Sequence, residues 1–227
     1  MQHVLLYSDS LSWGIVPGTR QRLPFAQRWA GVMEAALLAQ GCAVRVIEDC
    51  LNGRTTVLDD PVRAGRNGLQ GLAQRIEAHS PLALVILMLG TNDFQTVFEH
   101  NARDAAQGVA QLVATIRRAP IEPGMPSPPV LIVVPPLIRM PAGAMTEKFA
   151  GAADKAAGLA QAYQDVAEAL GCALFDANTI TEASRVDGIH LDADQHLALG
   201  NAMAHTVRHW LARPNPHHPT VASNTRR

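Results

Sequence analysis

Short apolar runs alternate with longer segments of helical spacing along most of this chain. The runs are bounded by polar, Gly or Pro residues and have the length of strands buried on both faces. They are Val4–Tyr7, Ala43–Ile47, Leu82–Leu89, Val130–Val134 and Ala173–Phe175. The segments of helical spacing are Phe25–Gln40, Leu69–His79, Ala102–Arg118, Ala152–Leu170 and Ala193–Leu211. This alternation predicts an α/β protein in which a mostly parallel five-stranded sheet lies between two layers of helices.

The apolar periodicity ends near residue 212. Beyond it the sequence is rich in Pro, Ser and Asn, so we expect one domain over residues 1–212 and a mobile tail over 213–227. Two long loops rich in Gly and Pro, Leu51–Gly68 and Pro135–Met145, follow the second and fourth predicted strands. Parallel sheets bind ligands beyond the carboxyl ends of their strands, so these loops are candidate pocket walls.

Composition narrows the classes of partner. Hydrophobic residues make up 48% of the chain and charged residues 17%, with a net charge of −1. Neither disorder nor a broad polyanion-binding surface is indicated, so no nucleic-acid partner is expected. The three cysteines, Cys42, Cys50 and Cys172, are an odd number without C-x-x-C spacing. That pattern argues against a disulfide framework and a thiolate zinc site, and we expect neither a metal nor a cofactor.

Targeting signals are also missing from the pattern. The chain starts Met-Gln-His, and its first apolar run has already ended by Ser8, which does not fit a signal peptide. The longest apolar stretch, Leu82–Leu89, is far shorter than the roughly 20 residues of a membrane-spanning helix. We therefore expect a cytoplasmic protein without a membrane partner.

A serine stands where the first predicted strand ends. The strand runs into Tyr7-Ser8-Asp9-Ser10-Leu11-Ser12-Trp13-Gly14, and a turn there would expose the Ser10 hydroxyl as a nucleophile. Its backbone N–H, at the start of a helical turn, would point toward developing negative charge. Taken alone, this segment is more often a simple turn or helix cap, because Ser and Asp are favoured there for local reasons.

Two further strand ends offer hydrogen-bond donors. Leu89-Gly90-Thr91-Asn92-Asp93 follows the third strand and would present the amide of Asn92 at the same edge as Ser10. Asn52-Gly53 follows the second strand, and Gly53 can bring its N–H close to a bound oxygen because it has no side chain. Both segments are also ordinary turn sequences, so neither is decisive by itself.

A candidate base stands in Asp187-Gly188-Ile189-His190, before the last helix. The three-residue spacing lets Asp187 accept a hydrogen bond from one imidazole nitrogen, which leaves the other free to take a proton from serine. A single His is more often structural, and Asp-Gly is a turn signal. The combination of these segments indicates a catalytic site, because independent turns have no reason to supply a nucleophile, donors, a base and its orienting carboxylate together.

These segments, in this order, resemble the SGNH (GDSL-like) hydrolase family, which implies its flavodoxin-like three-layer α/β/α fold. The resemblance implies a triad of Ser10, Asp187 and His190, with Ser10, Gly53 and Asn92 as the oxyanion hole. Further matches, including Asn-Gly-Arg-Thr-Thr and Asp59-Asp60-Pro61, are similar to the bacterial arylesterase and acyltransferase group, whose members tend to self-associate. A homo-oligomer is expected on that ground.

One position departs from the family pattern. The first glycine of the GDSL block is Ser8 here, which would be strained by roughly 1–2 kcal/mol if the turn required a positive φ. In extended geometry the change would cost little.

The expected function is hydrolysis of small aryl or short-chain esters through an acyl-enzyme. In a narrow apolar pocket an alcohol would compete with water and give acyl transfer. Trp13, Phe94, Phe149 and Ile189 are candidate substrate-binding residues, although each is equally compatible with the core. The alternatives are a carbohydrate deacetylase, a lysophospholipase, and a non-catalytic module that binds small molecules. No G-x-S-x-G elbow occurs, which disfavours the α/β-hydrolase arrangement.

Overall fold

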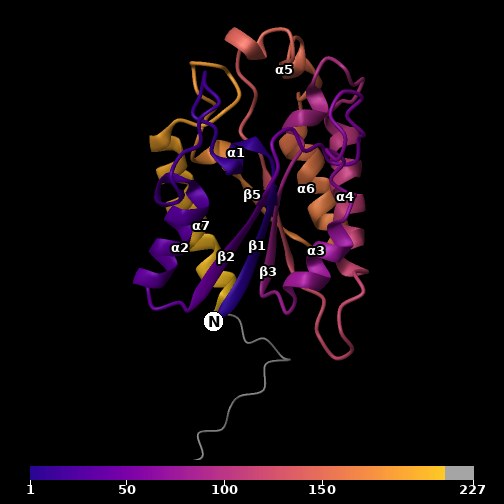
Figure 1. Cartoon of the computed structure of the whole chain (residues 1–227). Coiled ribbons are helices and arrows are strands. Elements are labelled where there is room, and N and C mark those ends of the chain that lie inside the picture. The colour runs from indigo at the N-terminus through magenta and orange to yellow at the C-terminus, as the bar shows by residue number, and fades with distance from the viewer. Residues whose placement is uncertain (213–227) are drawn as a thin grey trace, which may run out of the picture.

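Five parallel strands form the centre of the protein in a computed structural model that describes residues 1–212 (Figure 1). They are β1 (Gln2–Ser8), β2 (Val44–Cys50), β3 (Leu84–Met88), β4 (Val130–Val134) and β5 (Ala173–Asp176), in the order β2-β1-β3-β4-β5. Every residue of β3 and β4 is buried, as expected for apolar strands with helices on both faces. The predicted strands are confirmed, and the sheet is parallel throughout.

Helices cover both faces of the sheet. Helices α2 (Trp29–Ala39) and α7 (Ala193–Leu211) pack together on one face. On the other lie α3 (Leu72–His79), α4 (Ala102–Arg117) and α6 (Leu159–Leu170) (Figure 1). The predicted three-layer α/β/α architecture is therefore confirmed. Among residues 1–212, no helix is both long and apolar enough to span a bilayer.

Two predicted helices are interrupted. The segment over 152–170 divides into α5 (Ala152–Lys155) and α6, because Gly158 adopts a left-handed conformation with φ of 82°. The segment over 25–40 begins as the 3₁₀ turn η1 (Phe25–Gln27), and Arg28 is then extended before α2. The guanidinium of Arg28 donates to Glu48 and to the carbonyl of Leu23, contacts that tie this break to β2 and the preceding loop.

Short helical turns follow several strands or line the loops above the sheet. They are α1 (Ser10–Trp13), η2 (Thr91–Phe94), η3 (Gly143–Met145) and η4 (Ala177–Thr179). Sequence periodicity did not predict them, because three or four residues are too few to show a helical repeat. The predicted tail over 213–227 lies outside the described residues.

The strand register brings three loops to one edge of the sheet. Ser8, the last residue of β1, pairs with Cys50 of β2 on one side and with Met88 of β3 on the other. The segments that begin at Asp9, Leu51 and Leu89 therefore leave the sheet side by side. From β1 the chain first adds β2 on one side and then β3 on the other, so the strand order reverses direction at β1. Parallel sheets bind their ligands at such a reversal.

Helices α2 and α7 approach closely at Gly200. A β-carbon at this position would lie 2.6 Å from Cβ of Val32 and 2.8 Å from the carbonyl oxygen of Trp29. We expect Gly200→Ala to lower the free energy of unfolding by about 1–3 kcal/mol, because the helices must move apart. Chemical denaturation would measure this loss. Asn201→Ala, at the next and exposed position, should be neutral or slightly stabilising. A Gly200→Ala variant as stable as wild type would contradict the close packing.

Candidate active site

Ser10 is the first residue of helix α1, directly beyond β1. Asp9 caps this helix, because its side chain accepts a hydrogen bond from the N–H of Leu11 at 2.9 Å. The helix ends after one turn at Gly14, which is left-handed with φ of 84°. Both the capping role expected for this segment and the placement of Ser10 at the sheet edge are therefore present. They are compatible because the cap is supplied by Asp9 and not by Ser10.

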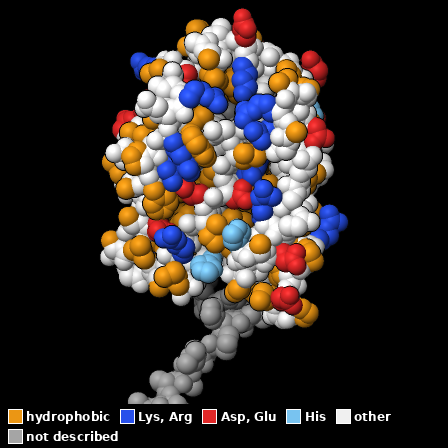
Figure 2. All heavy atoms as spheres, in the orientation of Figure 1, with side chains coloured by type: hydrophobic (Ala, Val, Ile, Leu, Met, Phe, Trp, Pro, Cys, Tyr) orange, Lys and Arg blue, Asp and Glu red, His pale blue; other side chains and the backbone are white. Residues whose placement is uncertain are grey.

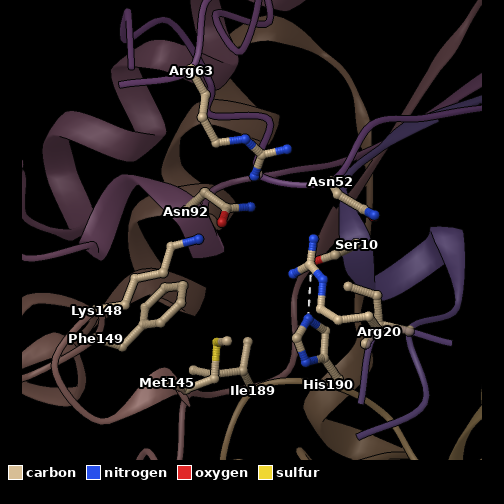
Figure 3. Close-up of a pocket in the computed structure, with 12 residues that line it drawn as sticks. Ser10, Arg20, Asn52, Arg63, Asn92, Met145, Lys148, Phe149, Ile189 and His190 are labelled. Carbon is tan, nitrogen blue, oxygen red and sulfur yellow. Dashed lines mark hydrogen bonds between the residues drawn. The ribbon is translucent and has the colours of Figure 1, made fainter. Parts of the chain in front are cut away.

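The hydroxyl of Ser10 faces an imidazole from the other end of the chain. His190 Nε2 lies 3.2 Å from Ser10 Oγ (Figure 3). His190 Nδ1 lies 2.8 Å from Asp187 Oδ2. All three residues are buried. With Nδ1 donating to the carboxylate, Nε2 is an acceptor for the serine proton, as in a catalytic triad.

Asp187 is fixed by its own loop and by a distant one. Its Oδ1 accepts from the N–H groups of Ile189 and His190, and its Oδ2 accepts from the N–H of Gly18. Burial acts to raise the pKa of Asp187, but the hydrogen bonds from His190 and Ile189 outweigh it and hold that pKa well below its ordinary range. The carboxylate therefore stays charged and keeps the His190 ring oriented.

Two backbone donors face the same space. Gly53 has φ of 82°, a left-handed conformation that favours glycine, and it lines the pocket together with Ser10. The N–H groups of Ser10 and Gly53 have no acceptor within residues 1–212. Free N–H groups beside a nucleophile are suited to a developing oxyanion.

Asn92 also lines this pocket, but its amide is already engaged. Its Nδ2 donates to Asp9 Oδ2 at 3.0 Å and to the carbonyl oxygen of Arg54 at 3.1 Å, while its Oδ1 accepts from Gln95 Nε2. Asn92 therefore connects the first loop to the second. To donate to an oxyanion as well, the amide would have to share one of these N–H groups.

Asp9 is a buried acid for which the sequence indicated only a helix-capping role. Burial raises its pKa to about 6, although bonds from Leu11 and Asn92 and the nearby charges of His190 and Arg54 lower it. Its presence beside Ser10 in the sequence suggested only capping. The contact with Asn92, 83 residues away, required the fold.

Arg54 and Thr56 attach the second loop to its neighbours. Arg54 Nη1 donates to the carbonyl of Ser8, and its guanidinium pairs with Asp49 at 2.7 Å and lies over the ring of Tyr7. Thr56 donates to Asp93 through both its N–H and its hydroxyl. The loops that carry Gly53 and Asn92 are thus held together by buried hydrogen bonds.

Ser8 is not strained. It lies in β1, and no residue other than glycine has a positive φ within the described chain. Its hydroxyl donates to the carbonyl of Met88 at 2.8 Å and lies 2.6 Å from Ser12 Oγ, which accepts from Trp29 Nε1. The replacement of the family glycine therefore adds a hydrogen-bonded link beneath the nucleophile in extended geometry.

The pocket above Ser10 is narrow. The region that the centre of a water molecule can occupy in it is about 20 Å³, enough for about one water. Of the predicted substrate-binding residues, Phe149 and Ile189 line it, whereas Trp13 and Phe94 are not among its lining residues. Phe94 is buried in the core, and the Trp13 ring lies under Arg22. The other lining residues are Ile15, Arg20, Asn52, Arg63, Met145 and Lys148, which sequence reasoning missed (Figure 3).

A wider cavity of about 220 Å³ adjoins the pocket on the side of His190. Arg20, Met145 and His190 line both spaces. The remaining walls come from Gly18 and Thr19, from residues 142–144, and from Val186 and Asp187. The predicted loop over 135–145 therefore contributes a pocket wall. No group of three His, Cys, Asp or Glu side chains able to hold a metal occurs within residues 1–212.

Comparisons with known proteins show the family of the chain. A model of the GDSL-like lipase/acylhydrolase family matches residues 9–222. A carbohydrate acetylesterase from Sinorhizobium meliloti is 36% identical with a TM-score of 0.85, covering 92% of this chain and 99% of that one. The native aryl esterase of M. smegmatis is 36% identical with a TM-score of 0.86, covering 92% and 100%. An arylesterase of Vibrio mimicus is 34% identical over 92 residues, 40% of this chain and only 38% of that protein.

Asp93 generates a prediction about pH and stability. Burial raises its pKa from 3.8 to about 7, although the bonds from Thr56 lower it. A raised carboxyl pKa contributes stability that is fully present below about pH 3.8 and is lost as the pH rises through about 7. In Asp93→Asn, the amide can still accept from the Thr56 N–H and donate to its hydroxyl, and it does not titrate. The variant should therefore gain stability relative to wild type between pH 5 and 7.

The expected gain is at most about 1.4 kcal/mol per pH unit, measured as the difference between urea unfolding free energies at each pH. Asp165→Asn, at an exposed carboxylate of α6, serves as the control, and its difference from wild type should stay flat. A flat difference for Asp93→Asn as well would show that Asp93 is ionised throughout this range.

Proposed function

Since the chain belongs to the GDSL-like lipase/acylhydrolase family, we propose that it is a carboxylic ester hydrolase acting through an acyl-enzyme on Ser10. The family membership confirms the resemblance predicted from the sequence. The single observation that carries the proposal is the continuous contact from Ser10 Oγ to His190 Nε2 and from His190 Nδ1 to Asp187.

In the proposed first step, His190 takes the Ser10 proton as Oγ attacks the ester carbonyl. The positive charge that forms on the imidazole is stabilised by Asp187, whose low pKa keeps it ionised. His190 then gives the proton to the departing alcohol oxygen, leaving the acyl group on Ser10. Water activated by His190 hydrolyses this intermediate and restores the free serine.

The oxyanion of the tetrahedral intermediate would be held by three donors. The free N–H groups of Ser10 and Gly53 support this role, and the amide of Asn92 lines the same pocket. Asn92 would share an N–H that now points to Asp9 or to the carbonyl of Arg54. Its three existing bonds hold the amide in place before the substrate arrives, which favours electrostatic preorganisation.

The two cavities suggest which part of an ester goes where. The small size of the pocket above Ser10 supports a short acyl group such as acetyl. The cavity of about 220 Å³ beside His190 would receive the alcohol portion, because His190 must reach the leaving oxygen. Short-chain esters with a larger alcohol are therefore the proposed substrates. This division suits both an aryl ester and an acetylated carbohydrate.

Transfer of the acyl group to an alcohol is proposed as a second outcome of the same intermediate. The narrow pocket restricts water, and an alcohol in the cavity beside His190 would be placed to compete with it. A carbohydrate deacetylase remains the alternative that the acetylesterase relative favours. The narrow acyl space gives no support to a lysophospholipase.

Self-association and a cytoplasmic location are also retained as proposals. Several apolar side chains are largely exposed, among them Val62, Val97, Leu137, Met140 and Val186. An interface between copies would remove such side chains from water. Light scattering of the purified full chain would give the assembly size directly.

Covalent labelling tests the nucleophile. A fluorophosphonate probe should modify wild type at Ser10, identified by peptide mapping, and should not label Ser10→Ala. Ester hydrolysis by Ser10→Ala should fall to background, because the step that forms the acyl-enzyme is lost. Ser127→Ala removes an exposed serine before β4 and should be labelled as wild type. Retained hydrolysis in Ser10→Ala would contradict the assignment of Ser10 as the nucleophile, whereas a wild type that is not labelled at Ser10 would favour the non-catalytic alternative.

Replacing Asn92 tests the oxyanion hole. Asn92→Ala should lower kcat for 4-nitrophenyl acetate by about 10²–10³, with a smaller change in KM, because the donor acts on the transition state. The variant also loses the bonds to Asp9 and Arg54, so a stability loss of about 1–3 kcal/mol is expected in urea unfolding. Gln95→Ala removes only the bond to Asn92 Oδ1 and should keep kcat much closer to wild type. A kcat within threefold of wild type in folded Asn92→Ala would exclude Asn92 as a donor.

A further inference from the structure

We propose that the ester hydrolysed at this site carries a negatively charged group on its alcohol portion, bound by Arg20, Arg63 and Lys148. The inference rests on the proposed esterase function and specifies its substrate class. It predicts a preference for anionic over neutral esters that neither an arylesterase nor an acetylesterase activity requires.

Three cations from three separate loops surround the pocket above Ser10. Arg20 follows α1, Arg63 belongs to the loop after β2, and Lys148 follows η3, and all three line the pocket. Figure 3 shows their charged ends directed into the space that also contains Asn52 and Asn92. Because these residues are far apart along the chain, no local sequence pattern predicts that they form a cluster.

These cations lack the ion-pair partners that six other arginines have. Arg22, Arg28, Arg45, Arg54, Arg75 and Arg139 all form ion pairs. By contrast, the charged ends of Arg20, Arg63 and Lys148 make no ion pair and no hydrogen bond to other residues within 1–212. Lys148 is half-buried and only lies over the Phe149 ring, at 5.6 Å. Unpaired cations held at the mouth of a reactive pocket indicate an anionic ligand.

The carboxylates Asp60 and Asp9 only partly offset them. Asp60 Oδ1 accepts from the N–H groups of Val62 and Arg63, which turns this side chain toward its own loop. Burial and then the charge of Arg63 lower the pKa of Lys148, with Asp60 acting in the opposite direction and Arg20 adding to the lowering. The three cations therefore repel one another across the pocket, and a bound anion would relieve that repulsion.

The local excess of positive charge is not a property of the whole chain. The net charge is −1, yet Lys and Arg side chains gather around the hollow in the upper half of the molecule (Figure 2). Arg63 comes especially near the reacting centre, since its Nη1 would lie 3.2 Å from a β-carbon built on Gly53. An anion held there would stay within reach of the proposed oxyanion hole.

The linings of the two spaces place the charge on the alcohol portion. The pocket above Ser10 is the smaller space, and Arg63 and Lys148 line it but not the cavity beside His190. Arg20 lines both the pocket and the cavity of about 220 Å³ beside His190, where the alcohol would leave. We place the anion of the alcohol at the junction of the two spaces, with Arg20 on the side of the wider cavity and Arg63 and Lys148 on the side of the pocket. Guanidinium groups bind carboxylate and phosphate in the same forked geometry, so either anion fits.

A matched pair of acetate esters tests the inference. For wild type and each variant we would measure kcat/KM for 4-acetoxybenzoate, which is anionic, and for its neutral methyl ester. Taking the ratio of the two values within each protein, and comparing ratios between proteins, cancels the different reactivities of the esters. Arg63→Gln and Lys148→Gln should each lower the ratio by about tenfold, as expected for a lost hydrogen bond to a charged group. Arg20→Gln, at an exposed residue, should lower it less.

Arg118→Gln is the matched control, because Arg118 is exposed at the end of α4, away from the carboxyl edge of the sheet. Its ratio should equal that of wild type. Raising the ionic strength from about 0.01 to 0.15 M should lower kcat/KM for the anionic ester much more than for the neutral one, because salt screens the attraction. Replacing the carboxylate by a phosphate on the same phenyl acetate should give a ratio with the same dependence on Arg63 and Lys148.

Three outcomes would overturn the inference. The first is an unchanged ratio in the Arg63→Gln/Lys148→Gln double variant while the methyl ester is hydrolysed, which leaves the esterase function standing. The second is a loss confined to an ester with its charge on the acyl side, such as mono-4-nitrophenyl succinate, which would contradict the placement on the alcohol. The third is a wild type that hydrolyses neither ester and is not labelled at Ser10, which would remove the proposed function together with the inference.

Discussion

The site depends on one buried amide, that of Asn92, which joins the loops leaving the carboxyl edge of the sheet. Its nitrogen donates to Asp9 beside the nucleophile and to the carbonyl of Arg54 beside Gly53. Because unpaired polar groups are costly to bury, these bonds constrain the three loops to one relative arrangement. The strand register makes the contact possible, since β1 lies between β2 and β3 and all three end at the same level.

Other buried polar groups strengthen the same constraint. Thr56 binds Asp93, Arg54 connects Ser8 to Asp49, and Ser8 connects β1 to β3 through the carbonyl of Met88. The acids Asp9 and Asp93 are held where burial raises their pKa to about 6 and about 7. The fold therefore carries groups that are unfavourable when ionised, next to the nucleophile and beneath the oxyanion donors. Such positions are where proteins often accept a stability cost for preorganised chemistry.

The two sides of the site differ in their electrostatics. Asp187 accepts four hydrogen bonds and keeps a negative charge behind His190, as the triad requires. In front of Ser10, Arg20, Arg63 and Lys148 supply positive charge without ion-pair partners in the described part of the chain. Such an arrangement combines a general base with a mouth that attracts anions. Substrate selection is then decided by residues outside the family motifs, on loops whose lengths and charges can vary without disturbing the triad.

The sequence by itself determined the strands and the architecture, and it supplied the candidate reactive side chains. Buried parallel strands are continuous apolar runs. The residues that follow them reach the same edge of the sheet regardless of the conformation of the loops. The sequence therefore predicts that four residues meet at this edge, and they line one pocket: Ser10, Gly53, Asn92 and His190. The extended geometry of Ser8 was one of two possibilities left open, and only the tertiary structure selected it.

Tertiary structure alone decided which side chains surround the reacting centre. Phe149 and Ile189 line the pocket while Phe94 is buried in the core and Trp13 packs under Arg22, although all four suited either environment. The bonds of Asn92 and the meeting of Arg20, Arg63 and Lys148 join residues tens of positions apart. Loop residues carry no periodic signal, so where their side chains point depends on packing and hydrogen bonds between loops that sequence spacing does not encode.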